Sequence, residues 1–132
     1  MWLAIPMSFL FGEKDALHFL FSGIITAGLG MFAYLPFRKA PIVINRRDGY
    51  VIVTGAWILF SLFGTLPFLL TRSIPNFTDA FFETISGFTT TGASILTDIE
   101  AIPKGLLYWR AMTHWIGGIG IIVLSIAILP LL

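Results

Sequence analysis

Four long apolar stretches limit what this chain can fold into more than any other feature. A helix needs about 20 apolar residues to cross the hydrocarbon core of a bilayer, and all but the first stretch reach that length. Only 11% of the 132 residues are charged, against about 25% in soluble proteins. The sequence therefore predicts an all-α integral membrane protein, with apolar segments at residues 1–11, 16–37, 50–70 and 105–132.

The two ends of the sequence and its composition set further expectations. Residues 1–11 lack the positive segment and the cleavage site of a signal peptide, and the sequence stops inside an apolar run. We therefore expect either a part of a longer membrane protein or a truncated gene product, with its first and last helices cut short. The absence of Cys excludes disulfides and thiolate metal sites. No basic patch points to nucleic acid, and no catalytic set of residues points to an enzyme.

Basic residues predict the orientation of the helices. The short loop at residues 38–49 holds four of the eight Lys and Arg residues and one acid, Asp48. Cytoplasmic loops carry an excess of Lys and Arg, although a single loop is a small sample. We expect loop 38–49 in the cytoplasm, so that residues 16–37 run inward and residues 50–70 run outward.

A short apolar helix and a Thr/Gly-rich run lie between the last two spans. The helix is expected at about residues 77–87, with Asn76 or Thr78 capping its start and Gly87 at its end. The β-branched threonines that follow favour extended backbone, and Gly92 allows conformations that other residues avoid. Carbonyls in such a run can replace the water around a dehydrated cation. The pattern indicates a pore loop; the alternative is a Ser/Thr-rich external loop.

The Thr-Thr-Gly pattern occurs once in these 132 residues. A re-entrant loop at membrane depth must be buried in protein or line water, and one copy cannot enclose an ion path. The other copies would come from further sequence of the same protein or from other subunits. Two alternatives remain open: four copies of this chain forming a homotetrameric cation channel, and a non-conducting membrane assembly module.

Two charged residues and a group of glycines near this run are expected to have structural roles. A charge at membrane depth costs about 2.5–3.5 kcal/mol or more unless it is paired. Our hypothesis is that Glu83 and Arg110 pair, or bond to loop carbonyls, and brace the run; the alternative is that Arg110 reaches the interface. No strand precedes Gly117, Gly118 and Gly120, so we read them as a helix packing surface rather than a dinucleotide motif.

Three motifs give the chain a resemblance to a known family. They lie at residues 79–83, 86–94 and 115–124, and they resemble the first pore repeat of the Trk/Ktr potassium transporter family, specifically of its TrkH-type membrane subunit. The resemblance implies a potassium-channel-like helix–pore loop–helix repeat at residues 50–132, one of four repeats in a single polypeptide. Residues 1–37 match only in hydropathy the extra transmembrane helix pair that precedes the repeats.

The family's function implies roles for the residues of the run at 89–94. The resemblance implies that the carbonyls of Thr90, Thr91, Gly92 and Ala93 bind K⁺, with Ser94 at the outer mouth and Thr89 stiffening the run. Ser94 stands where threonine is common in the family.

The resemblance also implies a biological setting. It implies potassium uptake across the bacterial inner membrane, with the filter on the outer side, K⁺ as the transported ion, and no cofactor or other metal. It further implies a cytoplasmic nucleotide-binding subunit of the TrkA type and a homodimer of the full-length protein.

Overall fold

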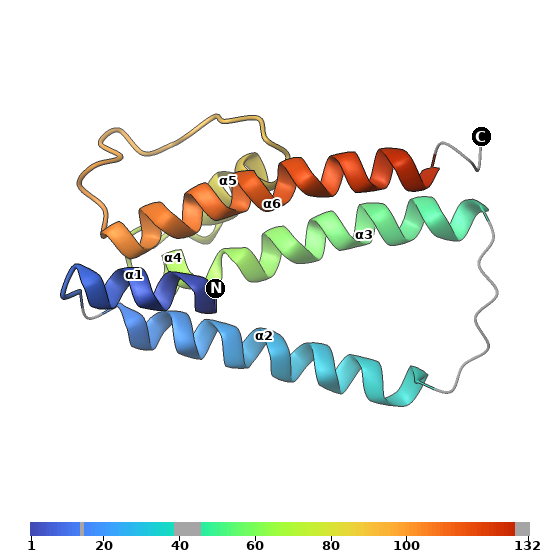
Figure 1. Ribbon diagram of the computed structural model, residues 1–132, viewed down its shortest axis with the longest axis horizontal. Coiled ribbons are helices and arrows are strands. Elements are labelled where there is room, and N and C mark those ends of the chain that lie inside the picture. Colours follow the sequence, from blue (N-terminus) through green and yellow to red (C-terminus); the bar gives the residue numbers. More distant parts are fainter. Residues whose placement is uncertain (14, 39–45, 129–132) are drawn as a thin grey trace.

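The computed structural model is a bundle of helices that lie roughly along one axis (Figure 1). The structure describes residues 1–13, 15–38 and 46–128, and within these ranges it contains helices and no strand. Residues 39–45, which make up most of the predicted loop 38–49, lie outside the described residues. The elements are η1 (Trp2–Ala4), α1 (Ile5–Leu10), α2 (Ala16–Phe37), α3 (Arg46–Gly64), α4 (Leu66–Leu70), α5 (Phe77–Phe88) and α6 (Lys104–Ile128).

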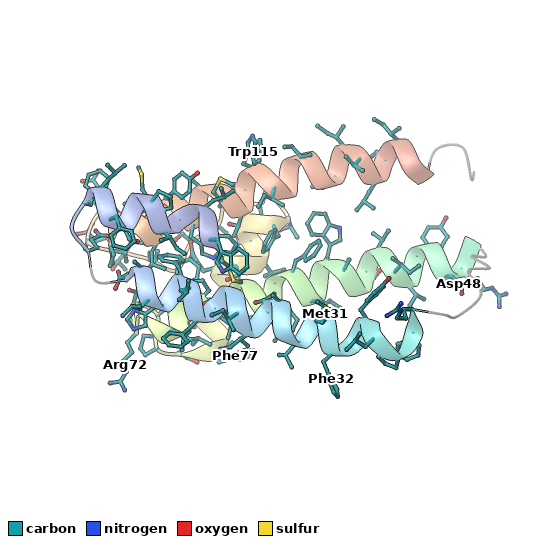
Figure 2. The ribbon with its side chains drawn as sticks, turned by 60° about the horizontal axis from the view of Figure 1, so that its bottom comes forward. Met31, Phe32, Asp48, Arg72, Phe77 and Trp115 are labelled. Carbon is teal, nitrogen blue, oxygen red and sulfur yellow. The ribbon has the colours of Figure 1, made fainter. Side chains whose placement is uncertain are left out.

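Three helical segments are long and apolar enough to cross a membrane, as the sequence predicted. They are Ala16–Phe37, Arg47–Leu70 and Lys104–Ile126. In each of them, no more than 28% of the most apolar stretch is buried inside the structure. Large apolar side chains point away from the bundle, among them Phe32 on α2 and Trp115 on α6 (Figure 2), with 78% and 62% of their surface exposed. A helix that is apolar on all sides suits a lipid environment or further packing partners.

The third apolar stretch is not the single helix that residues 50–70 were expected to form. Helix α3 starts earlier, at Arg46, with Asp48 in its first turn, where an acid interacts favourably with the helix dipole. It ends at Gly64, and Pro67, near the start of α4, supplies no backbone N–H to continue the hydrogen-bond ladder. The indole of Trp109 on α6 donates to the carbonyl of Gly64 at 3.1 Å, so this helix end is satisfied by a side chain.

The N-terminal helices pack against the start of α6. Both carboxylate oxygens of Glu13 accept backbone N–H groups there, from Lys104 at 2.7 Å and Gly105 at 3.0 Å. These are orphan donors of a helix N-terminus, so Glu13 caps α6 from another part of the chain. A side chain on Gly105 would overlap the hydroxyl of Ser8, so the glycine lets α1 approach closely.

Helix α5 lies between α3 and α6 and packs against both. Its buried residues Ala80, Glu83, Thr84 and Gly87 recur at helical spacing and form one face. Thr84 and Phe88 lie against Gly64 near the end of α3, where an added side chain would come within 2.9 Å of both. Helix α5 is therefore packed between the two neighbouring spans through its buried face.

Candidate functional site

The start of α5 is set by a side-chain cap. The side chain of Asn76 accepts the N–H of Thr78 at 3.2 Å, and Asp79 lies in the first turn. Asn76, one of the two candidates from the sequence, is thus the N-cap.

The end of α5 differs from the expectation. The helix continues through Phe88, with Thr89 as its C-cap, so Gly87 does not terminate it. A side chain on Gly87 would overlap the hydroxyl of Thr113, so this glycine is explained by close packing on α6.

Helix α5 ends against the glycines of α6. A side chain on Gly117 would overlap the backbone carbonyl of Phe88, the last residue of α5. An added Cβ on Gly118 would lie 3.8 Å from the methyl group of Thr90, and one on Gly120 would lie 3.0 Å from the ring of Trp57 on α3. Because α6 begins at Lys104 and rises about 1.5 Å per residue, the Gly117 contact lies about 20 Å along it.

The chain turns back after α5 through a left-handed residue. The N–H of Thr90 bonds to the carbonyl of Gly87 at 2.9 Å, and that of Thr91 to the carbonyl of Ser86 at 3.0 Å. These two bonds form a Schellman motif, whose left-handed position is usually glycine. Here it is Thr90, with φ of 56°, an uncommon and strained conformation for a β-branched residue. Strain of this kind concentrates at functional sites.

The φ angle changes sign from each residue to the next along the run that begins with this turn. It is positive at Thr90 and at Gly92, where it is 78°, and negative at Thr91 and Ala93. In a regular strand successive carbonyls point to opposite sides, whereas a φ angle that alternates in sign is compatible with carbonyls on one side. All four residues are exposed. Among the described residues, the carbonyls of Thr90, Thr91 and Gly92 accept no hydrogen bond.

Ser86 contacts this run twice, and nothing in the sequence indicates these contacts. Its carbonyl accepts the N–H of Thr91, and its hydroxyl donates to the carbonyl of Ala93 at 2.6 Å. A serine in the last turn of a helix is a common residue with many possible partners. Ser86 becomes adjacent to Ala93 only because the run folds back along α5.

Glu83 holds the far end of the run and is itself paired with Arg110. Its carboxylate accepts the hydroxyl of Ser94 at 3.0 Å, the N–H of Ile95 at 3.0 Å and the Nε–H of Arg110 at 2.5 Å. Glu83 is 1% exposed, so this charge is removed from solvent and compensated. Of the two possibilities for Arg110, the structure has the ion pair, and the contacts to the loop are a hydroxyl and an N–H rather than carbonyls.

Taken together, α5 and the run after it form a hairpin that enters and leaves at the same end of the bundle. Thr90, at its turn, lies near Gly118, while Ser94 has returned to the level of Glu83 and Arg110. Thr89 joins the turn through bonds from its hydroxyl to the carbonyl of Ile85 at 2.7 Å and to the Thr91 hydroxyl at 2.8 Å. Within the described ranges, no cluster of three or more His, Cys, Asp or Glu residues could hold a metal.

Comparison with known proteins places the chain in a family. The TrkH family model, described as a cation transport protein, matches residues 16–132. The Trk system potassium uptake protein TrkH of Halomonas elongata is 43% identical over 129 residues, which cover 97% of this chain and 27% of that protein. The Trk system potassium uptake protein TrkG of Escherichia coli is 37% identical over 127 residues, covering 96% of this chain and 26% of that protein.

The matched region is a limited part of these relatives. The chain spans about a quarter of the length of the curated relatives it matches. No solved structure gives a significant match. The family match nevertheless covers all three spans, α5 and the run after it. This chain therefore belongs to the TrkH family of cation transport proteins.

Proposed function

We propose that this chain contributes one of four selectivity filter strands to a potassium uptake protein of the cytoplasmic membrane. The observation that carries the proposal is the hairpin of α5 and residues 89–94. It turns about 20 Å along α6 and leaves three consecutive carbonyls without a hydrogen-bond partner among the described residues. Backbone carbonyls that replace the hydration shell are the ligands of potassium filters. The relatives named as potassium uptake proteins agree with this choice of ion.

The proposed filter is the run Thr90, Thr91, Gly92 and Ala93. A K⁺ ion that leaves water at this depth needs substitute oxygen ligands, and the exposed face of the run offers them. The C-terminus of α5 adds the negative end of a helix dipole, equivalent to roughly half an elementary charge, close to the same place. Both features favour a cation over an anion.

The surrounding residues hold the filter in place. The ion pair of Glu83 and Arg110 fixes the outer end at Ser94, and Thr89 stiffens the inner end through its hydroxyl bonds. The glycines of α6 bring that helix against the end of α5. Rigid placement of the carbonyls matters because an ion is recognised by oxygens that already stand at its coordination distance.

One strand cannot enclose an ion path, so the proposal needs three further strands. We place them in other helix–pore loop–helix repeats of the same polypeptide, around a pseudo-fourfold axis. The loop at residues 38–49 would face the cytoplasm and the filter would face outward. The family resemblance extends this to a homodimer and a cytoplasmic nucleotide-binding subunit of the TrkA type. The DNA that follows the codon for Leu132 decides between this assembly and the two alternatives, a homotetramer and a non-conducting module. Three more such repeats would support the single-polypeptide pore. A stop codon would favour one of the two alternatives.

Complementation of cells that lack potassium uptake tests the function. The complete gene product that contains this chain should restore growth at low K⁺, and Gly92→Asp should abolish it, because the new side chain disturbs a filter residue with φ of 78°. Gly12→Asp is the matched control, since Gly12 also has a positive φ and open surroundings. Unchanged growth of Gly92→Asp at equal protein level would refute the filter assignment.

A further inference from the structure

Ser86 is the one described residue whose polar groups bond to both Thr91 and Ala93 of the proposed filter. Its carbonyl accepts the N–H of Thr91 at 3.0 Å and faces that of Gly92 at 3.5 Å. Its hydroxyl donates to the carbonyl of Ala93 at 2.6 Å. Ser86 is 4% exposed, so its own side of both bonds is shielded from water. One side chain on α5 thus determines the direction of a backbone oxygen seven residues later.

The bond from Ser86 separates Ala93 from the three residues before it. The Ala93 oxygen is directed to the hydroxyl on α5, whereas the carbonyls of Thr90, Thr91 and Gly92 have no partner among the described residues. A carbonyl held by a short hydrogen bond to α5 is not free to turn toward an ion beside the exposed face. The four carbonyls of the run are therefore not equivalent.

We propose that Ser86 is a specificity-determining positioning residue that keeps the Ala93 carbonyl out of the ion's coordination shell. The inference rests on the proposed filter function and alters one part of it: this strand offers three fixed ligands, from Thr90, Thr91 and Gly92, rather than four. The number and rigidity of carbonyl ligands affect the discrimination between K⁺ and Na⁺. Without the Ser86 hydroxyl, the Ala93 carbonyl gains freedom to move toward a small ion, so Na⁺ gains more than K⁺.

Thr84 provides a matched control in the same helix. It is 1% exposed, and its hydroxyl donates to the carbonyl of Ala80 at 2.7 Å, within α5 and away from the filter. Thr84→Val removes a buried hydroxyl as Ser86→Ala does, and it keeps the shape of the side chain. A purely structural role of Ser86 would make the two variants behave alike.

The test is the ratio of K⁺ to Na⁺ uptake by the complete gene product that contains this chain, measured at equal protein level. Ser86→Ala should lower the ratio about 3- to 10-fold, which corresponds to the net contribution of one hydrogen bond. Thr84→Val should leave it unchanged, and Ser86→Thr, which retains the hydroxyl, should keep it near the wild-type value. An unchanged ratio in Ser86→Ala, or an equal fall in Thr84→Val, would overturn the inference.

Two further measurements keep the outcome decisive. If Ser86→Ala does not accumulate in the membrane, Ser86→Cys replaces it, because a thiol fills the position and donates weakly; an unchanged ratio there also overturns the inference. Gly92→Asp separates this inference from the filter assignment. Uptake that persists in Gly92→Asp refutes the filter itself, whereas loss of uptake there with a normal ratio in Ser86→Ala refutes only the role of Ser86.

Discussion

Glu83 shows how a single buried charge can organise a loop between two apolar spans. An isolated carboxylate inside a protein costs several kcal/mol, and the cost is recovered only when charge and hydrogen bonds compensate it. Glu83 gains both: Arg110 supplies the charge, and Ser94 and Ile95 supply further donors. The compensation that makes the charge tolerable therefore also fixes the outer end of the proposed filter.

Removing one partner of this pair should cost more than neutralising both. Arg110→Met leaves the Glu83 charge uncompensated and should lower the free energy of unfolding by about 3–5 kcal/mol. Adding Glu83→Gln should recover part of this loss, because a neutral amide oxygen still accepts the N–H of Ile95. Unfolding of the purified protein in detergent measures both effects. Additive losses in the double variant would contradict the coupling.

At the residue scale, the sequence predicted the charge pair but not the turn. Pairing of Glu83 follows from the cost of a charge at membrane depth, which needs no coordinates. The turn does not follow, because glycine is the usual left-handed residue after a helix and the sequence offers Gly87 and Gly92. The structure uses Thr90 between them, and the bond from Ser86 to Ala93 depends on that choice.

At the element scale, contact between α5 and α6 depends on the absence of side chains. The C-terminal end of α5 meets α6 at Gly117, where the backbone of Phe88 occupies the space of a Cβ. Gly87 gives the same close approach from the α5 side, against Thr113. Small residues at helix contacts are typical of membrane proteins, since they let backbones come near one another. This contact sets the depth at which the chain turns into the proposed filter.

Two adjacent glycine positions on α6 should therefore differ in how well they tolerate an added methyl group. Gly117→Ala places a methyl group on the Phe88 carbonyl and should destabilise the protein by about 1–3 kcal/mol or more, because backbone has to move. Gly118→Ala meets only the Thr90 methyl group at 3.8 Å and should be nearly neutral. Thermal unfolding and potassium uptake measure both variants. Equal tolerance at the two positions would show that α5 does not pack here as described.

The sequence predicts the positions of the spans better than it predicts the breaks within them. Length and apolarity were enough for residues 16–37. They also located the other two spans, which begin at Arg47 and Lys104, slightly before the predicted stretches 50–70 and 105–132. They could not place the break at Gly64, because its carbonyl is satisfied by Trp109, a residue 45 positions away. The cap that Glu13 gives to α6 spans 91 positions in the chain for the same reason. Side-chain caps from distant segments leave no periodic pattern in the sequence.

At the scale of the whole molecule, the chain exposes far more apolar surface than a soluble protein could. In none of the three spans is more than 28% of the apolar window buried, and the exposed face of the run at 90–93 has no described covering segment. Lipid can cover the helices, but it cannot satisfy unpaired carbonyls. The proposed further repeats would cover that face and complete the ligand set around the ion.

The proposed orientation is testable because the chain contains no Cys. Asp48 and Arg72 lie at opposite ends of the bundle (Figure 2), so the proposed orientation places them on different sides of the membrane. In a gene product without other cysteines, a membrane-impermeant maleimide added to intact cells should label Arg72→Cys and not Arg47→Cys. Permeabilised cells should give labelling of both. The reverse pattern in intact cells would invert the assigned topology.

The filter assignment is tested most directly by the K⁺ to Na⁺ uptake ratio of Gly92→Ala beside Gly12→Ala. Gly92 and Gly12 have φ of 78° and 67°, and neither has an atom within 4 Å of an added Cβ, so the backbone strain is matched. Forcing an Ala into this region costs roughly 1–2 kcal/mol, enough to change the ratio on the order of tenfold. We predict this fall for Gly92→Ala and a wild-type ratio for Gly12→Ala. A wild-type ratio in Gly92→Ala, or the same fall in both variants, would contradict the assignment.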